Sequence, residues 1–178
     1  GVDQDYIKAI SLYRKSADQK LDKAQYSLGE MYYYGRGVTL DYEQAYIWHR
    51  KAALQGYRYS QYNLGFMYSY GQGVTQNYKE AIRWYRKAAD QDHAEAQYLL
   101  GQAYEYGRGI TKNNQAALSW YKKASDQGHK KAKTQMDSLN ASIKSEAERK
   151  AAEAKKKAAE AKKKAEQDKA YDYVKKFI

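Results

Sequence analysis

A 36-residue period runs through the sequence and limits what the chain can fold into. Glycines recur at this spacing in three aligned sets, which are Gly29, Gly65 and Gly101; Gly35, Gly71 and Gly107; and Gly37, Gly73 and Gly109. Periods of 20–50 residues are typical of supersecondary units that stack side by side, because one unit alone cannot bury its apolar face. The period therefore predicts a stacked array, which provides a binding surface more readily than an active site.

Each unit is predicted to contain two helices. Asn77 with Glu80 forms a capping-box pattern, Asp41 with Gln44 repeats it, and Asp5 is expected to be a plain N-cap. Apolar residues then recur at helical spacing. The predicted helices span residues 5–18, 22–34, 41–55, 58–70, 77–91, 94–106, 113–127 and 130 onward. The sequence thus predicts an all-α fold, an α-α superhelix of paired helices.

Glycines also predict how the helices end and pack. Gly56 and Gly128 are expected to end two capped helices in the left-handed conformation, with Lys20 and Asp92 at the same slot in the other units. A glycine inside a helix costs about 1 kcal/mol relative to alanine. Three at one slot, beginning with Gly29, therefore predict a backbone crossing too close for a Cβ atom.

Several function classes are excluded by what the sequence lacks. With no Cys, the chain has no disulfides, thiolate metal sites or cysteine nucleophiles, although its compartment stays open. His93 and His129 share a slot but have no carboxylates at ligand spacing, so no metal site is expected. The turn at 35–37 follows no strand and lacks a Gly-Lys-Ser/Thr continuation, which argues against a nucleotide site. We find no nucleophile–base set, and we expect neither enzymatic activity nor a cofactor.

The C-terminal part of the sequence differs from the rest. Residues 141–178 contain 12 Lys/Arg and 7 Asp/Glu, a net charge of +5, against 20 and 14, or +6, in the first 140. Ala-Ala-Glu-Ala-Lys-Lys-Lys occurs twice, at 151–157 and 158–164, and predicts a long Lys/Ala-rich helix supported by Glu–Lys pairs four residues apart. We therefore predict a repeat domain over 1–140 and an extended helix over 141–178.

The long helix carries an alanine seam at heptad spacing, which buries little area in a coiled coil. Three arrangements stay open: a solvated rod, a helix folded back, or self-association with another copy. Its last apolar residues are a candidate anchor for a groove; they are Tyr171, Tyr173, Val174, Phe177 and Ile178.

No apolar stretch in the sequence approaches the roughly 20 residues that span a bilayer. The first residues do not resemble a signal peptide. Gly1-Val2 aligns with Gly37-Val38, partway through a repeat. We therefore expect the sequence to begin inside a longer array, with any export signal upstream.

One unit reads Ala-Gln-Tyr-x-Leu-Gly-x-x-Tyr-x-x-Gly-x-Gly-Val and then Asp-Tyr-x-x-Ala-x-x-Trp-Tyr-x-Lys-Ala-Ala-x-Gln-Gly. This pattern resembles the Sel1-like repeat (SLR), a relative of the tetratricopeptide repeat. The resemblance covers Lys23 to Gln127, with residues 1–22 similar to the second half of a preceding unit. Departures are His49 in a Tyr slot and Leu12 in a Trp slot. The resemblance implies a non-enzymatic scaffold or adaptor of bacterial type, and it favours the periplasm or secretion over other compartments.

Slots that differ between units are free to specify a partner, whereas constant slots are expected to pack. On the glycine-bearing helices the differing slots form a stripe at i, i+4 and i+7, here called the variable stripe. In tetratricopeptide-like solenoids this helix lines the concave face, and the resemblance implies the same placement. The candidate protein-binding residues are Lys23, Ser27, Glu30, Tyr59, Asn63, Phe66, Glu95, Leu99 and Gln102, extended by the constant Tyr34, Tyr70 and Tyr106.

Phe66, flanked by Tyr59, Tyr70 and Leu99, is the strongest candidate anchor for a protein or peptide partner. Packing inside the array is the alternative for Phe66 and Tyr59, and for the three constant tyrosines. Packing is also expected of Trp48, Trp84 and Trp120. Besides a protein-binding scaffold, the basic composition leaves open a nucleic-acid-binding surface, and the long helix a structural spacer.

Overall fold

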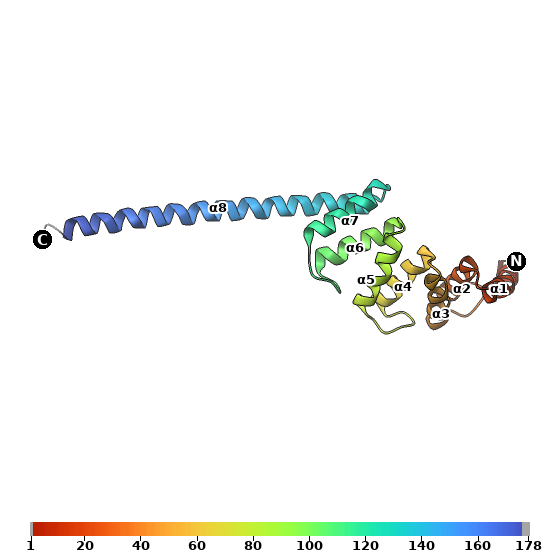
Figure 1. Cartoon of the computed structure of the whole chain (residues 1–178). Helices are drawn as coiled ribbons and strands as arrows, with labels where there is room; N and C mark the ends of the chain where they lie inside the picture. The colour runs from red at the N-terminus through yellow and green to blue at the C-terminus, as the bar shows by residue number, and fades with distance from the viewer. Residues whose placement is uncertain (1, 176–178) are drawn as a thin grey trace. The chain divides into compact units, whose positions relative to one another are not determined.

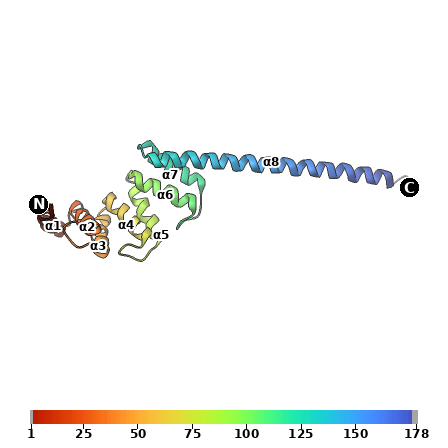
Figure 2. The ribbon, with the colours of Figure 1, turned by 180° about the vertical axis from the view of Figure 1, so that it is seen from behind.

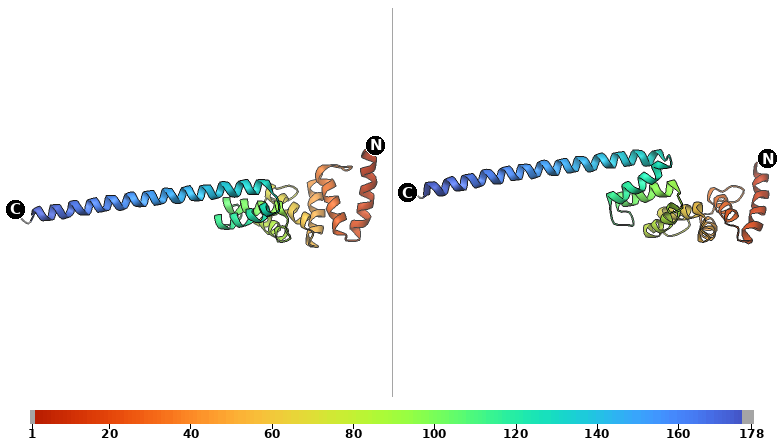
Figure 3. Two further views of the ribbon diagram at one scale, coloured as in Figure 1. Left: turned by 90° about the horizontal axis from the view of Figure 1, so that it is seen from above. Right: turned by 45° about the horizontal axis from the view of Figure 1, so that its top comes forward.

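The computed structural model describes residues 2–175 of the chain, and these residues form eight α-helices and no strand (Figure 1). The all-α prediction is confirmed. The helices are α1 (Val2–Asp18), α2 (Asp22–Tyr34), α3 (Tyr42–Leu54), α4 (Arg58–Tyr70), α5 (Tyr78–Ala89), α6 (Ala94–Tyr106), α7 (Asn114–Asp126) and α8 (Lys130–Lys175). Each of α1 to α6 packs against the next helix in the sequence, and Figure 3 shows α1 to α4 side by side. Two compact units result, residues 1–136 and 137–178.

The N-caps predicted at Asp41 and Asn77 are present, but the capping box is only half formed. The Asp41 carboxylate accepts a hydrogen bond from the backbone N–H of Gln44 at 2.9 Å, and Asn77 accepts from Lys79 and Glu80 at 3.1 Å each. The backbone N–H groups of Asp41 and Asn77 donate to carbonyl oxygens in the preceding helix instead of to the side chain three residues on. The turn therefore satisfies an orphan carbonyl at the end of one helix with a donor from the next cap.

The expectation for Asp5 was wrong. Helix α1 begins at Val2, so Asp5 lies inside the helix rather than at its cap. In the other units, a left-handed glycine at the end of a helix forces the turn that precedes the cap, as Gly35 does with φ 65°. Residues 2–4, which align with the residues before the cap in the other units, are helical here.

The turns after α1, α3, α5 and α7 each contain a left-handed residue at one slot of the repeat. Gly56 and Gly128 adopt φ 95° and 86°, and Lys20 and Asp92 adopt φ 62° and 58°. A residue with a Cβ atom is strained there by about 1–2 kcal/mol, because Cβ approaches the following carbonyl. The left-handed turn at the predicted glycines is confirmed, and the other two units form it at a cost.

Replacing Lys20 with glycine should therefore stabilise the array by about 0.5–1 kcal/mol, since relief of strain exceeds the added flexibility of the unfolded chain. The matched reverse change, Gly56→Ala, should cost about 1 kcal/mol, because no atom lies within 4 Å of the added Cβ and only the backbone is affected. Urea denaturation followed by circular dichroism measures both. A lower midpoint for Lys20→Gly than for the parent chain would show that the slot does not strain the lysine.

The mid-helix glycines make room for an aromatic ring, not for a crossing backbone as the sequence suggested. A Cβ atom added to Gly29 would lie 2.7 Å from the imidazole of His49, and at Gly65 and Gly101 it would overlap the rings of Tyr85 and Tyr121. The three rings come from the helix that follows in each case, α3, α5 and α7. They occupy one slot of the repeat, so the glycine and the ring together set how closely each helix pair packs.

Buried glutamines connect successive units. The side chains of Gln25, Gln61 and Gln97 are each nearly inaccessible, and their amides donate to the carbonyl oxygens of Ala17, Ala53 and Ala89. A second glutamine, at the end of the next capped helix, donates to each of them at 2.7 Å; these donors are Gln55, Gln91 and Gln127. Each buried amide is thus hydrogen-bonded to the backbone of the helix before it and to a glutamine of the next capped helix. This series of bonds fixes the position of each unit relative to the next.

The three tryptophans lie half-buried on the capped helices. Trp48 and Trp120 pack against core clusters, as predicted. A lysine three residues on places its ammonium over each indole, with distances to the ring centroid of 3.9 Å at Trp48, 4.5 Å at Trp84 and 4.2 Å at Trp120. These rings are thus covered from solvent by the chain's own cations.

Helix α8 is continuous through the Lys/Ala-rich segment (Figure 2). Within the second unit, residues 144–173 are all exposed, so no part of the alanine seam is covered there. Two of the expected pairs form, Glu146–Lys150 at 2.6 Å and Glu153–Lys157 at 2.9 Å. Tyr171 and Tyr173 are about two-thirds exposed. The Val174 side chain, Phe177 and Ile178 lie outside the described residues, and the role of the tail stays a prediction. No helix among the described residues is long and apolar enough to cross a membrane.

Candidate functional site

The residues of the variable stripe lie on α2, α4 and α6, and part of the stripe lines a hollow between α2 and α4. This hollow has a volume of about 100 Å³ and is called here the Glu30 pocket; its walls are Glu30, Tyr33, Tyr34, Tyr62, Asn63 and Phe66. Four of the six are predicted site residues. Because two successive units contribute to the pocket, residues that differ between units meet in one place.

A second hollow of about 130 Å³ contains three further members of the predicted set, Tyr70, Leu99 and Gln102, together with Arg108 and residues of α5. Leu99 also packs against the core cluster around Tyr85. The remaining predicted residues line neither hollow; these are Lys23, Ser27, Tyr59, Glu95 and Tyr106.

Phe66 does not have all the neighbours that the sequence suggested. Its ring lies 4.4 Å from that of Tyr70 and 6.4 Å from that of Tyr62, centroid to centroid. The Tyr59 ring is not among its neighbours; it lies against Tyr57, Tyr26 and His93. The reason is distance along the helix, since seven residues at 1.5 Å each place Tyr59 and Phe66 about 10 Å apart. Tyr59 and Phe66 are thus connected only through His93 and Tyr62. Tyr62 and Tyr33 are pocket residues that the sequence did not identify.

The constant tyrosines are not packed away inside the array. Tyr34, Tyr70 and Tyr106 expose 53%, 63% and 51% of their surface. The Arg36 guanidinium lies over the Tyr34 ring at 4.7 Å, and Arg108 lies over Tyr106 at 5.5 Å. At the corresponding position of the middle unit, Gln72 accepts a hydrogen bond from the Tyr33 hydroxyl at 2.7 Å.

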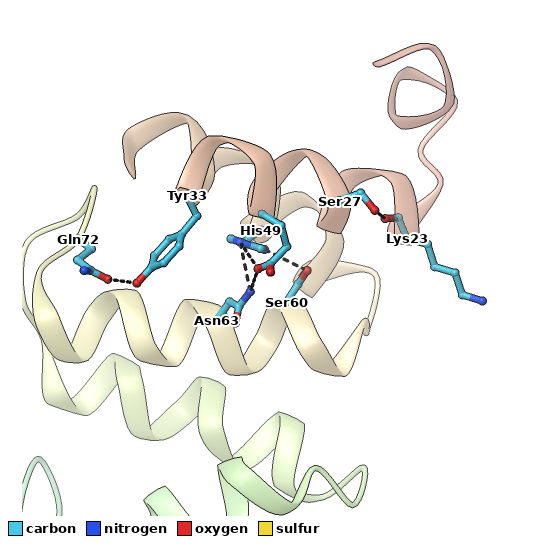
Figure 4. A network of polar contacts seen from close by, with 8 residues as sticks. Lys23, Ser27, Tyr33, His49, Ser60, Asn63 and Gln72 are labelled. Atoms are coloured by element: carbon cyan, nitrogen blue, oxygen red, sulfur yellow. Dashed lines mark hydrogen bonds and ion pairs between the residues drawn. The ribbon is translucent and has the colours of Figure 1, made fainter. Parts of the chain in front are cut away.

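His49 is fully buried beside the pocket and contacts two polar side chains of α4. Figure 4 shows Asn63 and Ser60 on α4 facing its ring; the Asn63 amide is 3.3 Å from Nε2 and the Ser60 hydroxyl 3.5 Å from Nδ1. Both partners are departures from the repeat, since Ala96 and Leu99 hold those slots in the next unit. Burial lowers the pKa of His49 to about 3, so the imidazole is neutral at physiological pH.

Glu30 connects this network to the pocket. Its Oε1 accepts a hydrogen bond from the Asn63 amide at 2.7 Å and lies 3.6 Å from His49 Nε2. Three-quarters of the Glu30 side chain is covered, and desolvation raises the pKa of its carboxyl above the usual value, opposed by the Asn63 hydrogen bond and by Arg36. Because His49 is neutral, the contact between them is not an ion pair. The pocket therefore contains a partly desolvated carboxylate held in place by an amide.

Two further histidines have structural roles. His93 and His129 accept hydrogen bonds at Nδ1 from the backbone N–H groups of Ala96 and Ala132, and so cap α6 and α8. Their rings stack on tyrosines of the preceding unit, His93 on Tyr62 at 4.8 Å and His129 on Tyr98 at 4.7 Å. No group of three or more His, Cys, Asp or Glu that could hold a metal occurs among the described residues.

Comparison with known families identifies the repeat. Four segments of the chain match the Sel1 repeat, residues 1–21, 22–57, 58–93 and 94–129. The first match is shorter than the other three, as expected for part of a unit. No curated protein matches the chain.

Solved structures show the same solenoid. The chain is 38% identical to a Sel1 repeat protein from Oxalobacter formigenes, with a TM-score of 0.71. The match covers 75% of this chain and 53% of that one. It is 34% identical to a protective antigen of uropathogenic Escherichia coli with an SLR fold, with a TM-score of 0.74 over 75% of this chain and 29% of that one. Cysteine rich protein B of Helicobacter pylori, at 23% identity and TM-score 0.59, covers 74% and 95% and is similar in fold alone. The chain thus spans about a third to a half of the length of the first two.

Proposed function

The chain belongs to the Sel1 repeat family, whose members are generally non-catalytic protein-interaction scaffolds, and we propose that it binds a protein or peptide partner along the variable stripe. The observation that carries the proposal is the meeting of Glu30 and Tyr34 from α2 with Asn63 and Phe66 from α4 in one hollow. A concave, partly apolar site with a few fixed polar groups is typical of ligand and peptide recognition.

The exposed aromatic residues beside the hollow support the same proposal. Phe66 is half-buried and Tyr70 is 63% exposed, so both retain ring surface that a partner can cover. Aromatic residues dominate binding energy at interfaces because each buries a large area with few rotatable bonds. The constant packing slots beneath them, including the glycines and rings, keep this surface rigid, which limits the entropy lost on binding.

The test begins with selection of binding peptides from a random displayed library against the intact chain. The double variant Phe66→Ala/Tyr70→Ala should bind the selected peptides at least about tenfold more weakly, a loss of about 1.4 kcal/mol. The measurement is fluorescence anisotropy of labelled peptide, and circular dichroism establishes that the variant is folded.

A matched control removes apolar surface elsewhere. Ile47 and Leu54 on α3 are 41% and 60% exposed and line neither hollow, so Ile47→Ala/Leu54→Ala should leave affinity unchanged. If the control loses binding and the Phe66/Tyr70 variant keeps it, the partner uses another face. If Phe66→Ala fails to fold, Phe66→Leu with Tyr70→Ala replaces it.

A further inference from the structure

We propose that the Glu30 pocket takes the cationic head of a lysine or arginine side chain from the bound partner. The inference rests on the proposed function, and it specifies which chemistry the partner must present at one site. Three features of the pocket support it: the residues that line it, the lack of a cation at ion-pair distance from Glu30, and the contact between Arg36 and the ring of Tyr34.

The lining combines one carboxylate with four aromatic rings. Glu30 is the single charged residue of the pocket, and Asn63 fixes its Oε1 from the side. Tyr33, Tyr34, Tyr62 and Phe66 supply the aromatic walls. Cations are attracted both to a carboxylate and to ring faces within about 6 Å, and the attraction is stronger where water is excluded. At about 100 Å³ the hollow has room for an ammonium or guanidinium group.

The carboxylate of Glu30 has no cationic partner within the described part of the chain. No lysine or arginine nitrogen among residues 2–175 lies within ion-pair distance of it, and the neighbouring His49 is neutral. Burying a carboxylate without a counter-charge is unfavourable, and the raised pKa of Glu30 reflects this. An incoming cation would supply the missing charge, so its binding gains energy that an uncharged side chain cannot.

The chain's own arginine shows that this environment accepts a cation. Arg36 lies at 4.7 Å over Tyr34, one of the pocket walls, and favours the ionised form of Glu30 from outside ion-pair range. The second hollow offers a contrast within the same molecule. It is lined by Arg108 and contains no carboxylate, so it should not take a cation. The stripe therefore presents one cation-selective hollow and one that is not.

The experiment uses small probes that reproduce a single side chain. ¹H–¹⁵N spectra of the intact chain are recorded during titration with N-acetyl-lysine-N-methylamide and, separately, with the norleucine analogue, which has a similar length and no charge. The lysine probe should shift signals of the pocket residues and bind at least about fivefold more tightly than the norleucine probe, a difference of about 1 kcal/mol. Equal affinity of the two probes, or no shift with the lysine probe, would overturn the proposal.

Two variants locate the effect. Glu30→Gln retains an oxygen for the Asn63 hydrogen bond and removes the charge, so it should reduce affinity for the lysine probe by at least about fivefold. Glu43→Gln removes one charge from an exposed position on α3 and should change nothing. Unchanged lysine binding by Glu30→Gln would refute the role of this carboxylate.

Failure of the pocket proposal can be distinguished from failure of the proposed function. If selected peptides need Phe66 and Tyr70 but tolerate Glu30→Gln and replacement of their lysines and arginines by norleucine, the stripe binds partners and the cation site is wrong. If selected peptides bind the Phe66→Ala/Tyr70→Ala variant as tightly as the parent chain, the proposed function itself is wrong.

Discussion

Replacing Gly101 with alanine should lower the free energy of unfolding by about 1–2 kcal/mol, although alanine is the better helix former. The added Cβ atom would overlap the ring of Tyr121, which is fully buried and whose hydroxyl donates to Glu105 at 2.6 Å. A ring held at both ends cannot move aside without loss of packing or of that hydrogen bond. Overpacking costs about 1–3 kcal/mol, and the cost at Gly101 should lie in the upper part of this range because the added Cβ would overlap a buried ring. Alanine regains roughly 1 kcal/mol through its higher helix propensity. Urea denaturation measures the change.

The double variant Gly101→Ala/Tyr121→Ala separates the two contributions. Tyr121→Ala alone should destabilise the array by about 3–5 kcal/mol, because a large buried ring is lost. In that background the ring is absent, so adding Gly101→Ala should stabilise the chain by about 1 kcal/mol. A stabilising effect of Gly101→Ala in the parent chain as well would show that the glycine does not make room for the ring.

Acidification should destabilise the array through His49, by about 1.4 kcal/mol for each pH unit below pH 6.5. Burial holds the pKa of His49 at about 3 in the folded chain, against an ordinary value of about 6.5 when unfolded. Above pH 6.5 both states are neutral at this residue and it contributes no pH dependence. Between pH 6.5 and 3, His49 binds a proton in the unfolded chain but not in the folded chain, so the free energy of unfolding falls as the pH falls. At pH 4.5 the loss is about 2.7 kcal/mol.

Comparison with His49→Gln isolates this contribution. The glutamine variant should be less stable at pH 7, yet its stability should fall less steeply between pH 6.5 and 4.5. Other groups act in the same window: burial also lowers the pKa of His93, which adds to the loss, whereas the raised pKa of Glu30 opposes it. The parent chain and His49→Gln share these contributions to a large extent. The difference between their slopes of unfolding free energy against pH therefore measures the contribution of His49. Parallel pH profiles for the two proteins would mean that the buried imidazole is protonated without penalty.

Local sequence signals were sufficient to predict the helices. Caps such as Asp41 and Asn77 and left-handed turns such as Gly56 act over a few residues, so their patterns can be recognised one unit at a time. The 36-residue period predicts a stacked array, and the resemblance of each unit to the Sel1-like repeat implies the solenoid. The atoms that face Gly29 were predicted wrongly. A glycine shows that another group lies too close for a Cβ atom, but it does not show whether that group is a backbone or, as here, the ring of His49.

The pocket could be predicted only in part, for a physical reason. Differences between the units identify Glu30, Asn63 and Phe66 as candidate site residues, but they do not show that these three meet in one pocket. His49, Ser60 and Asn63 depart from the repeat together because a buried imidazole needs hydrogen-bond partners where a tyrosine ring needs none at that point. Three departures around one slot are a signal that a search for coordinated changes would find. Tyr33 and Tyr62 lie off the stripe, and only the three-dimensional arrangement of α2 and α4 places them at the pocket.

The proposed function requires a partner to contact the variable stripe and not another face of the array. The most direct measurement is amide chemical-shift mapping of the ¹⁵N-labelled intact chain with its strongest selected peptide. We predict that the largest shifts fall on α2 and α4 around Glu30, Asn63 and Phe66, and extend to Leu99 and Gln102 on α6. Shifts concentrated on the tryptophan-bearing helices α3, α5 and α7, or on residues 144–173 of α8, would contradict it.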